Sequence, residues 1–276
     1  MTPAARVRIN ELTDPACPVA FSAEPVRRRL QWVFGQQITW HRVMVVLNDG
    51  TGDRGGPPRE RMAASRRRLH EIWGMPLDPD AFATVTATVD ATRLVLAARL
   101  HDPDHEDAAL RALRVHAMAG GELDRRTVQR VGGEAGVSPQ AITALDTPTV
   151  SACLARDMAA ARAPTPAALA LGHRLAGGGA RYPTPSYQYD PAAAHFELVG
   201  IHPFEAHEAV LANLQAQLQR RPPPESVTEV LTWAGEPLAT AEVVAVMAAS
   251  PRQVRAELRE VAAFHPMGLD GFWSLH

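Results

Sequence analysis

Residues 13–20, T-D-P-A-C-P-V-A, place Cys17 at the start of a predicted helix. Thiol-disulfide enzymes attack with a thiolate whose pKa is lowered at a helix N-terminus, and a second cysteine one turn later clears the mixed disulfide. Ala20 stands where that resolving cysteine would be. Cys17 could therefore act as a monothiol nucleophile or remain as an inert, half-buried hydrophobic residue. A self-contained dithiol cycle is excluded at this site.

The second cysteine, Cys153, is expected in the packed core of a distant helix, out of reach of Cys17. Two cysteines in a chain without a recognisable signal peptide indicate a reducing compartment, so we expect a cytoplasmic protein. The apolar fraction of 46% and the charged fraction of 21% are typical of a soluble globular protein. A formal net charge of −2 provides no basic field for nucleic acid, and no segment is apolar for long enough to span a membrane.

A strand, a helix and a second strand are predicted to position Cys17. Residues 7–12 alternate apolar and polar side chains, as a half-buried strand does, and residues 38–47 have the apolar, β-branched composition of a buried strand. Between them a helix begins at Pro18, which suits a first helical turn, and ends at Gly35. These elements predict a βαβ unit with parallel strands.

The middle of the chain is predicted to be helical. The loop at residues 48–58 is rich in glycine but lacks the Gly-Lys-Ser/Thr ending of a phosphate-binding loop. Apolar stripes with a period of 3.6 then predict helices over residues 59–73, 86–99, 106–119, 124–135 and 147–163. The arginine runs at residues 27–29 and 66–68 are interpreted as solvated helix faces, since acidic residues lie near both.

Strand patterns return after residue 179. Residues 181–189 and 195–200, joined by a turn at residues 190–193, predict a β-hairpin, and a helix over residues 203–218 should pack on it. The order is therefore βαβ, a block of helices, then ββα. This order predicts an α/β protein with a thioredoxin-like fold and an inserted all-helical domain.

Five segments in this order resemble the DsbA family of thiol-disulfide oxidoreductases, in particular its cytosolic, FrnE/YjbH-like branch. The segments are T-D-P-A-C-P-V-A-F-S-A-E-P-V-R-R-R-L, W-G-M-P-L-D-P-D-A-F, A-L-R-V-H-A-M-A-G-G-E-L-D-R-R-T-V, R-Y-P-T and L-V-G-I-H-P-F-E-A-H-E-A-V. The resemblance spans roughly residues 7–218. It implies that C-P-V-A is a degenerate C-x-x-C motif with Cys17 in the attacking position.

The resemblance also implies a cis-proline loop that faces the cysteine and pairs with an extended substrate segment. Pro183, preceded by Tyr182 and followed by Thr184, is predicted to be that cis-proline; an ordinary trans proline is the alternative. Val19 departs from the family, which usually has an aromatic residue there. The candidate partner-binding residues beside Cys17 are therefore Pro18, Val19, Ala20, Tyr182, Pro183 and Thr184.

The C-terminal segment is predicted to be a small winged-helix-like module. After the proline-rich residues 220–226 come two helix patterns, the second starting at a predicted N-cap, Thr240, then a third helix and a short wing. On the third helix, arginines alternate with Glu257 and Glu260, which disfavours DNA binding. The expected domains are residues 5–50 and 176–218 for the two thioredoxin halves, 51–175 for the insertion and 219–276 for the module.

Three functions remain open. The first is a DsbA-like protein that binds a partner polypeptide, as an adaptor similar to the YjbH-type adaptors of ClpXP or as a redox-responsive scaffold. The second is an enzyme, either a monothiol oxidoreductase or a glutathione-dependent transferase or isomerase, although such isomerases have serine in place of Cys17. The third and weakest is a nucleic-acid-binding regulator acting through the C-terminal module.

No cofactor is expected, unless glutathione or another small thiol serves one of the enzyme functions. His195, His202 and His207 lack a cysteine or carboxylate at metal-ligand spacing, so no metal site is expected. The oligomeric state is left open by the sequence.

Overall fold

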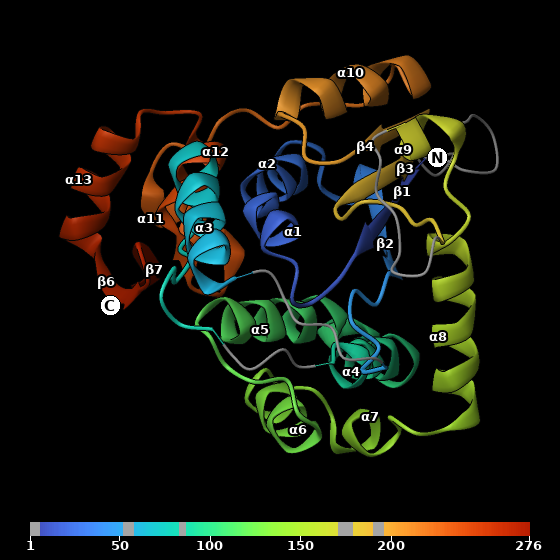
Figure 1. The fold of residues 1–276 in the computed structure, drawn as a ribbon. Coiled ribbons are helices and arrows are strands. Elements are labelled where there is room, and N and C mark those ends of the chain that lie inside the picture. Colours follow the sequence, from blue (N-terminus) through green and yellow to red (C-terminus); the bar gives the residue numbers. More distant parts are fainter. Residues whose placement is uncertain (1–5, 52–57, 83–86, 171–178, 190–195) are drawn as a thin grey trace.

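A four-stranded mixed sheet forms the centre of the computed structural model, which describes residues 6–51, 58–82, 87–170, 179–189 and 196–276. The strand order is β2-β1-β3-β4. β1 runs parallel to β2, whereas β3 is antiparallel to both β1 and β4. The strands are β1 (Val7–Thr13), β2 (Ile38–Met44), β3 (Ser186–Tyr189) and β4 (Phe196–Val199). This topology confirms the predicted thioredoxin-like α/β fold (Figure 1).

The helix that follows β1 is divided in two. α1 (Pro18–Ser22) carries the candidate site, and α2 (Glu24–Phe34) continues to the short 3₁₀ turn η1 (Gly35–Gln37) before β2. α2 shares an apolar cluster with the sheet and with α10 (Phe204–Leu214), in which Leu30 and Ile9 are fully buried. Burial of this apolar surface anchors the helix that carries Cys17 to the sheet.

The helical insertion, α3 to α9, lies between β2 and β3. Its central helix α4 contacts α5, α6, α7 and α8 and is apolar on most sides, as a fully surrounded helix should be. The helices are α3 (Arg59–Trp73), α4 (Val89–His101), η2 (Pro103–His105), α5 (Glu106–Met118), α6 (Arg125–Glu134), α7 (Pro139–Thr143), α8 (Pro148–Ala161) and α9 (Pro166–Ala170). The predicted helices of this block are therefore present, with ends shifted by a few residues.

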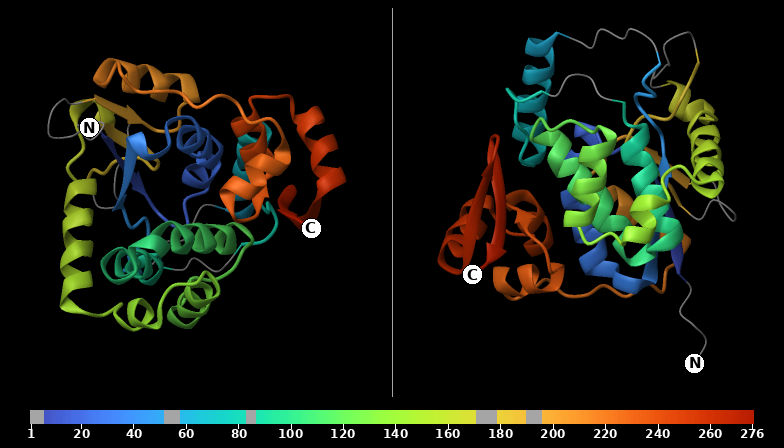
Figure 2. Two further views of the ribbon diagram at one scale, coloured as in Figure 1. Left: turned by 180° about the vertical axis from the view of Figure 1, so that it is seen from behind. Right: turned by 90° about the horizontal axis from the view of Figure 1, so that it is seen from below.

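The C-terminal module has the order of a winged helix. Its elements are α11 (Val227–Ala234), β5 (Leu238–Ala239), α12 (Thr240–Met247), α13 (Pro251–Val261), β6 (Ala262–Met267) and β7 (Asp270–Leu275). The strands form a sheet of order β5-β7-β6. Figure 2 shows the module, in orange to red, on the side of the molecule away from α8.

The prediction that Thr240 caps α12 is wrong. Ala239 is the N-cap, and its N–H donates to the carboxylate of Glu242 at 2.8 Å. The Thr240 hydroxyl instead accepts a hydrogen bond from the indole N–H of Trp273 at 2.9 Å. The strand β5, whose pairing with β7 is not visible in the local sequence, moves the helix start by one residue.

The interpretation of residues 27–29 as a solvated face is also wrong. Arg27 and Arg28 are only 4% and 7% exposed. Arg27 pairs with Glu24 and with Asp107 of α5, whereas Arg28 pairs with Glu242 of α12. Asp107 and Glu242 come from distant parts of the chain, so the local pattern could reveal only Glu24, three residues before Arg27.

The second arginine run behaves differently along its length. Arg66 is half-buried and donates to the backbone carbonyls of Asp78 and Ala81, at 2.5 and 2.8 Å, whereas Arg67 and Arg68 are exposed as predicted.

The predicted turn at residues 190–193, His195 and residues 52–57 of the glycine-rich loop lie outside the described residues. Among the described residues, no helix is long and apolar enough to cross a membrane.

Candidate functional site

Cys17 lies in the tight turn between β1 and α1. It is the N-cap of α1, and its own N–H donates to the carbonyl of Asp14 at 3.2 Å. The Asp14 carboxylate accepts hydrogen bonds from the N–H groups of Ala16 and Leu47 and from the hydroxyl of Thr88, each at 2.8 Å. The turn that presents the sulfur is thus fixed to the loop after β2 and to the start of α4.

The sulfur of Cys17 is enclosed by hydrogen-bonding groups. The Thr184 hydroxyl donates to Sγ at 3.0 Å, and the N–H of Ala20 donates to it at 3.4 Å. The thiol in turn donates to the carbonyl of Thr184 at 3.4 Å. Only 4% of Cys17 is exposed, so little solvent reaches the sulfur.

The electrostatics of the site favour a neutral thiol. Burial raises the pKa of Cys17, and the hydrogen bonds from Thr184 and Ala20 offset only part of that effect; the nearby Asp14 charge adds to it. The sequence predicted that the helix N-terminus would favour a thiolate. The structure points the other way, because α1 has only five residues and the cost of burying a charge outweighs the field at its end.

Position 20, three residues after Cys17, is packed. Ala20 is 1% exposed, whereas Pro18 and Val19, which separate it from Cys17, are half-buried. Both cysteines of the chain are free. Cys153 lies on α8, where its sulfur accepts a hydrogen bond from Arg156 at 3.2 Å, so the local geometry provides no replacement for the resolving cysteine.

The prediction of a cis peptide bond at Pro183 is wrong. The cis bond joins Thr184 to Pro185, and Thr184 is therefore the residue that precedes the cis-proline and faces Cys17. The sequence contains two X-Pro bonds one residue apart, and nothing local distinguishes them. Pro183 is buried, and its carbonyl accepts a hydrogen bond from the Ser186 hydroxyl at 2.7 Å.

Tyr182 does not form part of the surface around the sulfur. It is 1% exposed and packs in an apolar cluster with Leu12 and Val43. Its hydroxyl donates to Glu197 at 3.1 Å and accepts from Gln188 at 3.1 Å. Its role is to hold the Thr184 segment against the sheet.

Two residues that sequence reasoning missed lie near the thiol. Burial raises the pKa of Asp14, despite the hydrogen bonds it accepts. Arg181 is half-buried and interacts electrostatically with both Cys17 and Asp14, while it donates to the carbonyl of Tyr182 at 2.8 Å. The D-P-x-C spacing could have indicated Asp14; Arg181 has no local signal.

The histidines near the second half of the fold have structural contacts. His207 is buried, and its ring bonds the Tyr189 hydroxyl and packs edge-on against Tyr187. His202 bonds the carbonyl of Val199 at 3.1 Å. Within the residues that the structure describes, no group of three or more His, Cys, Asp or Glu side chains is placed to hold a metal ion.

Comparison with known sequences gives one partial match. No protein-family model matches the chain. The chain is similar to the ClpXP adapter protein SpxH of Halalkalibacterium halodurans, with 29% identity over 120 residues. That segment covers 40% of this chain and 38% of the adapter, so it spans well under half of the adapter's length.

Comparison with solved structures gives much broader coverage. A candidate protein disulfide isomerase from Nitrosomonas europaea superposes with a TM-score of 0.61 and 15% identity, over 77% of this chain and 99% of that one. A candidate DsbA oxidoreductase from Streptomyces coelicolor superposes with a TM-score of 0.57 and 18% identity, over 80% of this chain and 93% of that one. The cytosolic disulfide reductase DsbM of Pseudomonas aeruginosa superposes with a TM-score of 0.53 and 18% identity, over 76% of this chain and 99% of that one. That protein has also been solved with GSH. The chain therefore has the DsbA-type thioredoxin fold.

Proposed function

We propose that this protein binds a partner polypeptide at the face formed by the start of α1 and the Thr184–Pro185 segment, and does not run dithiol exchange there. The observation that carries the proposal is the enclosed Cys17 thiol, held by Thr184 with Ala20 in place of a second sulfur. A buried thiol with a raised pKa is a poor nucleophile. The fold is kept while the redox pair is lost, which is what a docking role requires.

The proposed docking face consists of half-buried side chains and backbone groups, and it presents no reactive sulfur. Pro18 and Val19 lie beside the thiol and are half-buried. An extended peptide can pair with a backbone segment of this kind through main-chain hydrogen bonds, with side-chain pockets giving specificity. The partial similarity to an adapter protein supports this role, and a cytoplasmic location, part of the same proposal, fits two free cysteines.

Site-specific photo-crosslinking tests the proposal. A photo-crosslinking residue at Val19 should capture a polypeptide partner, whereas the same residue at Ala159, exposed on α8, should not. Val19→Glu should abolish the capture, because it places a charge on the half-buried face. Cys17→Ser should retain it, because the sulfur is not required for docking.

Loss of capture in Cys17→Ser, combined with reduction of a protein disulfide by the wild type and not by that variant, would overturn the proposal. Folding of each variant is checked by circular dichroism.

Monothiol exchange with glutathione is the second candidate, and the position of Arg181 is the observation in its favour. A positive charge that interacts with Cys17 can stabilise a thiolate. The Cys17 thiolate would attack a disulfide between glutathione and a second thiol, form a disulfide with the glutathione sulfur and release the second thiol as a thiolate; a free glutathione thiolate would then attack the bound glutathione sulfur, release glutathione disulfide and restore the Cys17 thiolate. Rapid glutathionylation of Cys17, lost in Arg181→Gln, would favour this candidate over docking.

A further inference from the structure

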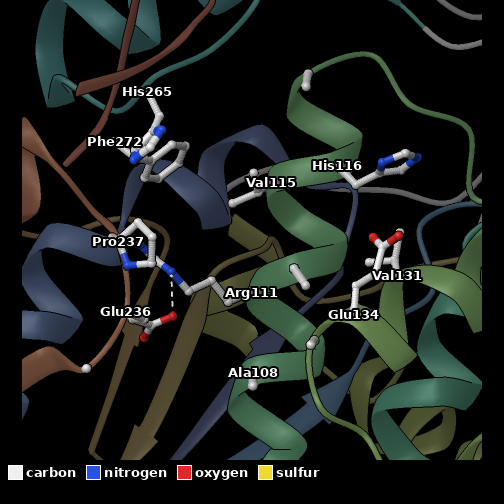
Figure 3. Close-up of a pocket in the computed structure, with 14 residues that line it drawn as sticks. Ala108, Arg111, Val115, His116, Val131, Glu134, Glu236, Pro237, His265 and Phe272 are labelled. Atoms are coloured by element: carbon white, nitrogen blue, oxygen red, sulfur yellow. Dashed lines mark hydrogen bonds and ion pairs between the residues drawn. The ribbon is translucent and has the colours of Figure 1, made fainter. Parts of the chain in front are cut away.

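A cavity with a volume of about 820 Å³ lies between the helical insertion and the C-terminal module (Figure 3). One side is formed by α5 and α6, and the other by residues 235–237 together with β6 and β7. None of its lining residues belongs to the Cys17 site. Its volume falls within the range of about 300–1,000 Å³ that small-molecule sites occupy, and such sites often lie between structural units.

The cavity is open because the helix that forms its floor has small side chains. Along α5, Ala108, Ala112, Val115 and Ala119 recur at spacings of three and four and so lie on one face. Phe272 closes the opposite wall with an aromatic ring. The walls are therefore mainly apolar and suit an apolar molecule, whose burial there removes hydrophobic surface from water.

Four of the five N–H groups of the one arginine in the cavity wall already have partners within the protein. The Arg111 guanidinium donates to both oxygens of Glu242, at 2.7 and 2.8 Å, and to the carbonyl of Pro237 at 2.8 Å. Its remaining Nε lies 3.0 Å from Glu236. Figure 3 shows Arg111 turned toward Glu236 and Pro237 at one end of the cavity.

Two carboxylates remain accessible from the cavity. Glu236 is one-third exposed, and each of its oxygens can accept a further hydrogen bond beyond those from Arg28 and Arg111. Glu134, at the end of the cavity away from Arg111, is exposed, and both of its oxygens accept from Arg130, one helical turn back, at 2.8 Å; each oxygen has a further lone pair for a ligand. Arg111 is neutralised by Glu236 and Glu242, and the cavity is also lined by the imidazoles of His116 and His265, whose Nε2 atoms bond the carbonyl of Glu122 at 3.1 Å and the hydroxyl of Ser274 at 2.8 Å.

We propose that this cavity binds a small apolar molecule that carries a protonated amine. The apolar body lies on the alanine-rich face of α5 against Phe272, and the ammonium group donates to Glu134 or Glu236. A ligand with a carboxylate or sulfonate is disfavoured, because it meets the carboxylates of Glu134 and Glu236 beside a guanidinium that is already paired with two carboxylates. The site is independent of the polypeptide-binding face proposed around Cys17.

Three naphthalene probes of similar size test the charge preference by fluorescence titration of the whole protein. Dansylcadaverine is cationic, N-phenyl-1-naphthylamine is neutral and 1-anilinonaphthalene-8-sulfonate is anionic. Dansylcadaverine should bind saturably with one site per chain and about tenfold or more tighter than the sulfonate. Glu134→Gln should weaken dansylcadaverine severalfold and leave the neutral probe unchanged.

Two variants locate the binding. Val115→Trp and Ala119→Trp fill the cavity and should each abolish saturable binding, whereas Ala159→Trp on α8 should not change it. Ala119 is exposed at the rim, so this variant keeps the test valid if Val115→Trp lowers the melting temperature. Any of three results would overturn the proposal. The sulfonate probe could bind as tightly as dansylcadaverine, the Ala119→Trp variant could bind the probe as well as wild type does, or no probe could bind saturably.

Discussion

The sulfur of Cys17 begins a helix, yet its surroundings keep it as a thiol. Thr184 contributes both a donor and an acceptor, so the neutral S–H group has a complete set of partners. A thiolate would lose the hydrogen bond to the Thr184 carbonyl and face the Asp14 charge. At this scale the burial of the sulfur, with the Asp14 charge beside it, decides the chemistry that the cysteine can perform.

Alkylation of Cys17 by iodoacetamide should therefore be slow near neutral pH, with a rate–pH midpoint above the ordinary thiol value of about 8.5. Thr184→Val removes the hydroxyl that donates to Sγ and should move the midpoint still higher. Peptide mass spectrometry separates Cys17 from Cys153. A midpoint below the ordinary value would contradict the assignment of a neutral thiol.

The same shift has a consequence for stability. The folded-state pKa of Cys17 is raised, so the folded protein binds that proton more tightly than the unfolded chain does. The stabilisation that this proton gives is fully present at pH values below the pKa of Cys17 in the unfolded chain. It is lost as the pH rises through the pKa of Cys17 in the folded protein. In urea denaturation at alkaline pH, wild type should lose more stability than Cys17→Ser, which cannot ionise there.

Restoring the second sulfur gives a further test at the same residue pair. The N–H of Ala20 is 3.4 Å from Sγ of Cys17, so a side chain at position 20 starts close to that sulfur. Ala20→Cys should form an intramolecular disulfide on oxidation, seen in the intact mass as the loss of both thiol hydrogens. The double variant Cys17→Ser with Ala20→Cys is the control and should show no such loss; an equal loss there would mean that Cys153 is the partner.

At the scale of elements, α6 can approach α4 closely because Gly132 has no side chain. A Cβ at Gly132 would lie 2.7 Å from a methyl group of Leu94, which is fully buried in α4. At the next residue, Gly133, a Cβ would make an ordinary contact of 3.7 Å with Ile142. Two adjacent glycines of one helix therefore have different constraints.

Gly132→Ala should destabilise the protein by roughly 1–3 kcal/mol, because Leu94 must move within a packed core. Gly133→Ala should be neutral or stabilise it by up to about 1 kcal/mol, because alanine is the better helix former. Urea denaturation of the two variants beside wild type measures both changes. Equal effects would show that α6 and α4 do not pack as closely as described.

The helix α13 has a mixed charged face. Arg255 forms two hydrogen bonds with Asp270 of β7, at 3.1 and 3.0 Å, and is thereby turned toward its own module. Arg252 and Arg259 remain exposed beside Glu257 and Glu260. Since nucleic-acid affinity depends on excess positive charge, the structure adds no support to that function.

At the scale of the whole molecule, buried ion pairs connect the sheet, the helical insertion and the C-terminal module. Arg114 of α5 pairs with Glu11 of β1 and Glu24 of α2. Arg28 of α2 and Arg111 of α5 both pair with Glu242 of α12, which is fully buried. The module is thus held to the other two parts by charges that cannot be left unpaired without a large cost.

Glu242→Gln should destabilise the protein by about 3–5 kcal/mol at neutral pH, because Arg28 and Arg111 lose their buried counter-charge. Burial alone would raise the pKa of Glu242, but the charges of Arg111 and Arg28 outweigh it and lower the pKa. The stabilisation by the Glu242 carboxylate is therefore present at pH values above the pKa of Glu242 in the unfolded chain. It is lost as the pH falls through the pKa of Glu242 in the folded protein. The difference between wild type and variant in urea denaturation should shrink in acid.

Glu229→Gln is the matched control, because Glu229 pairs with Arg221 at the surface, where both side chains are exposed. Such pairs contribute about 0–1 kcal/mol. A cost for Glu242→Gln no larger than that of the control would show that the ion cluster does not hold the module in place.

The order of elements was predictable from the sequence because it depends on local apolar periods and on glycine and proline. Residues 59–73 were predicted as a helix with the bounds that α3 has. The place of Cys17 at the start of a helix and the alanine at position 20 also follow from the sequence. The predicted start of a helix was wrong where the preceding residues pair with a distant strand, as at Thr240, which follows β5.

The sequence by itself thus determined the thioredoxin-like order of strands and helices and the absence of a second cysteine one turn after Cys17, since both depend on residue types at short spacings. The tertiary structure decided that Thr184 faces the sulfur, that Cys17 is a buried thiol and that Arg28 is part of an ion cluster. It also decided that a cavity remains between α5 and the module. These features depend on contacts between residues far apart in the chain, and burial and charge pairing follow only once the fold brings them together.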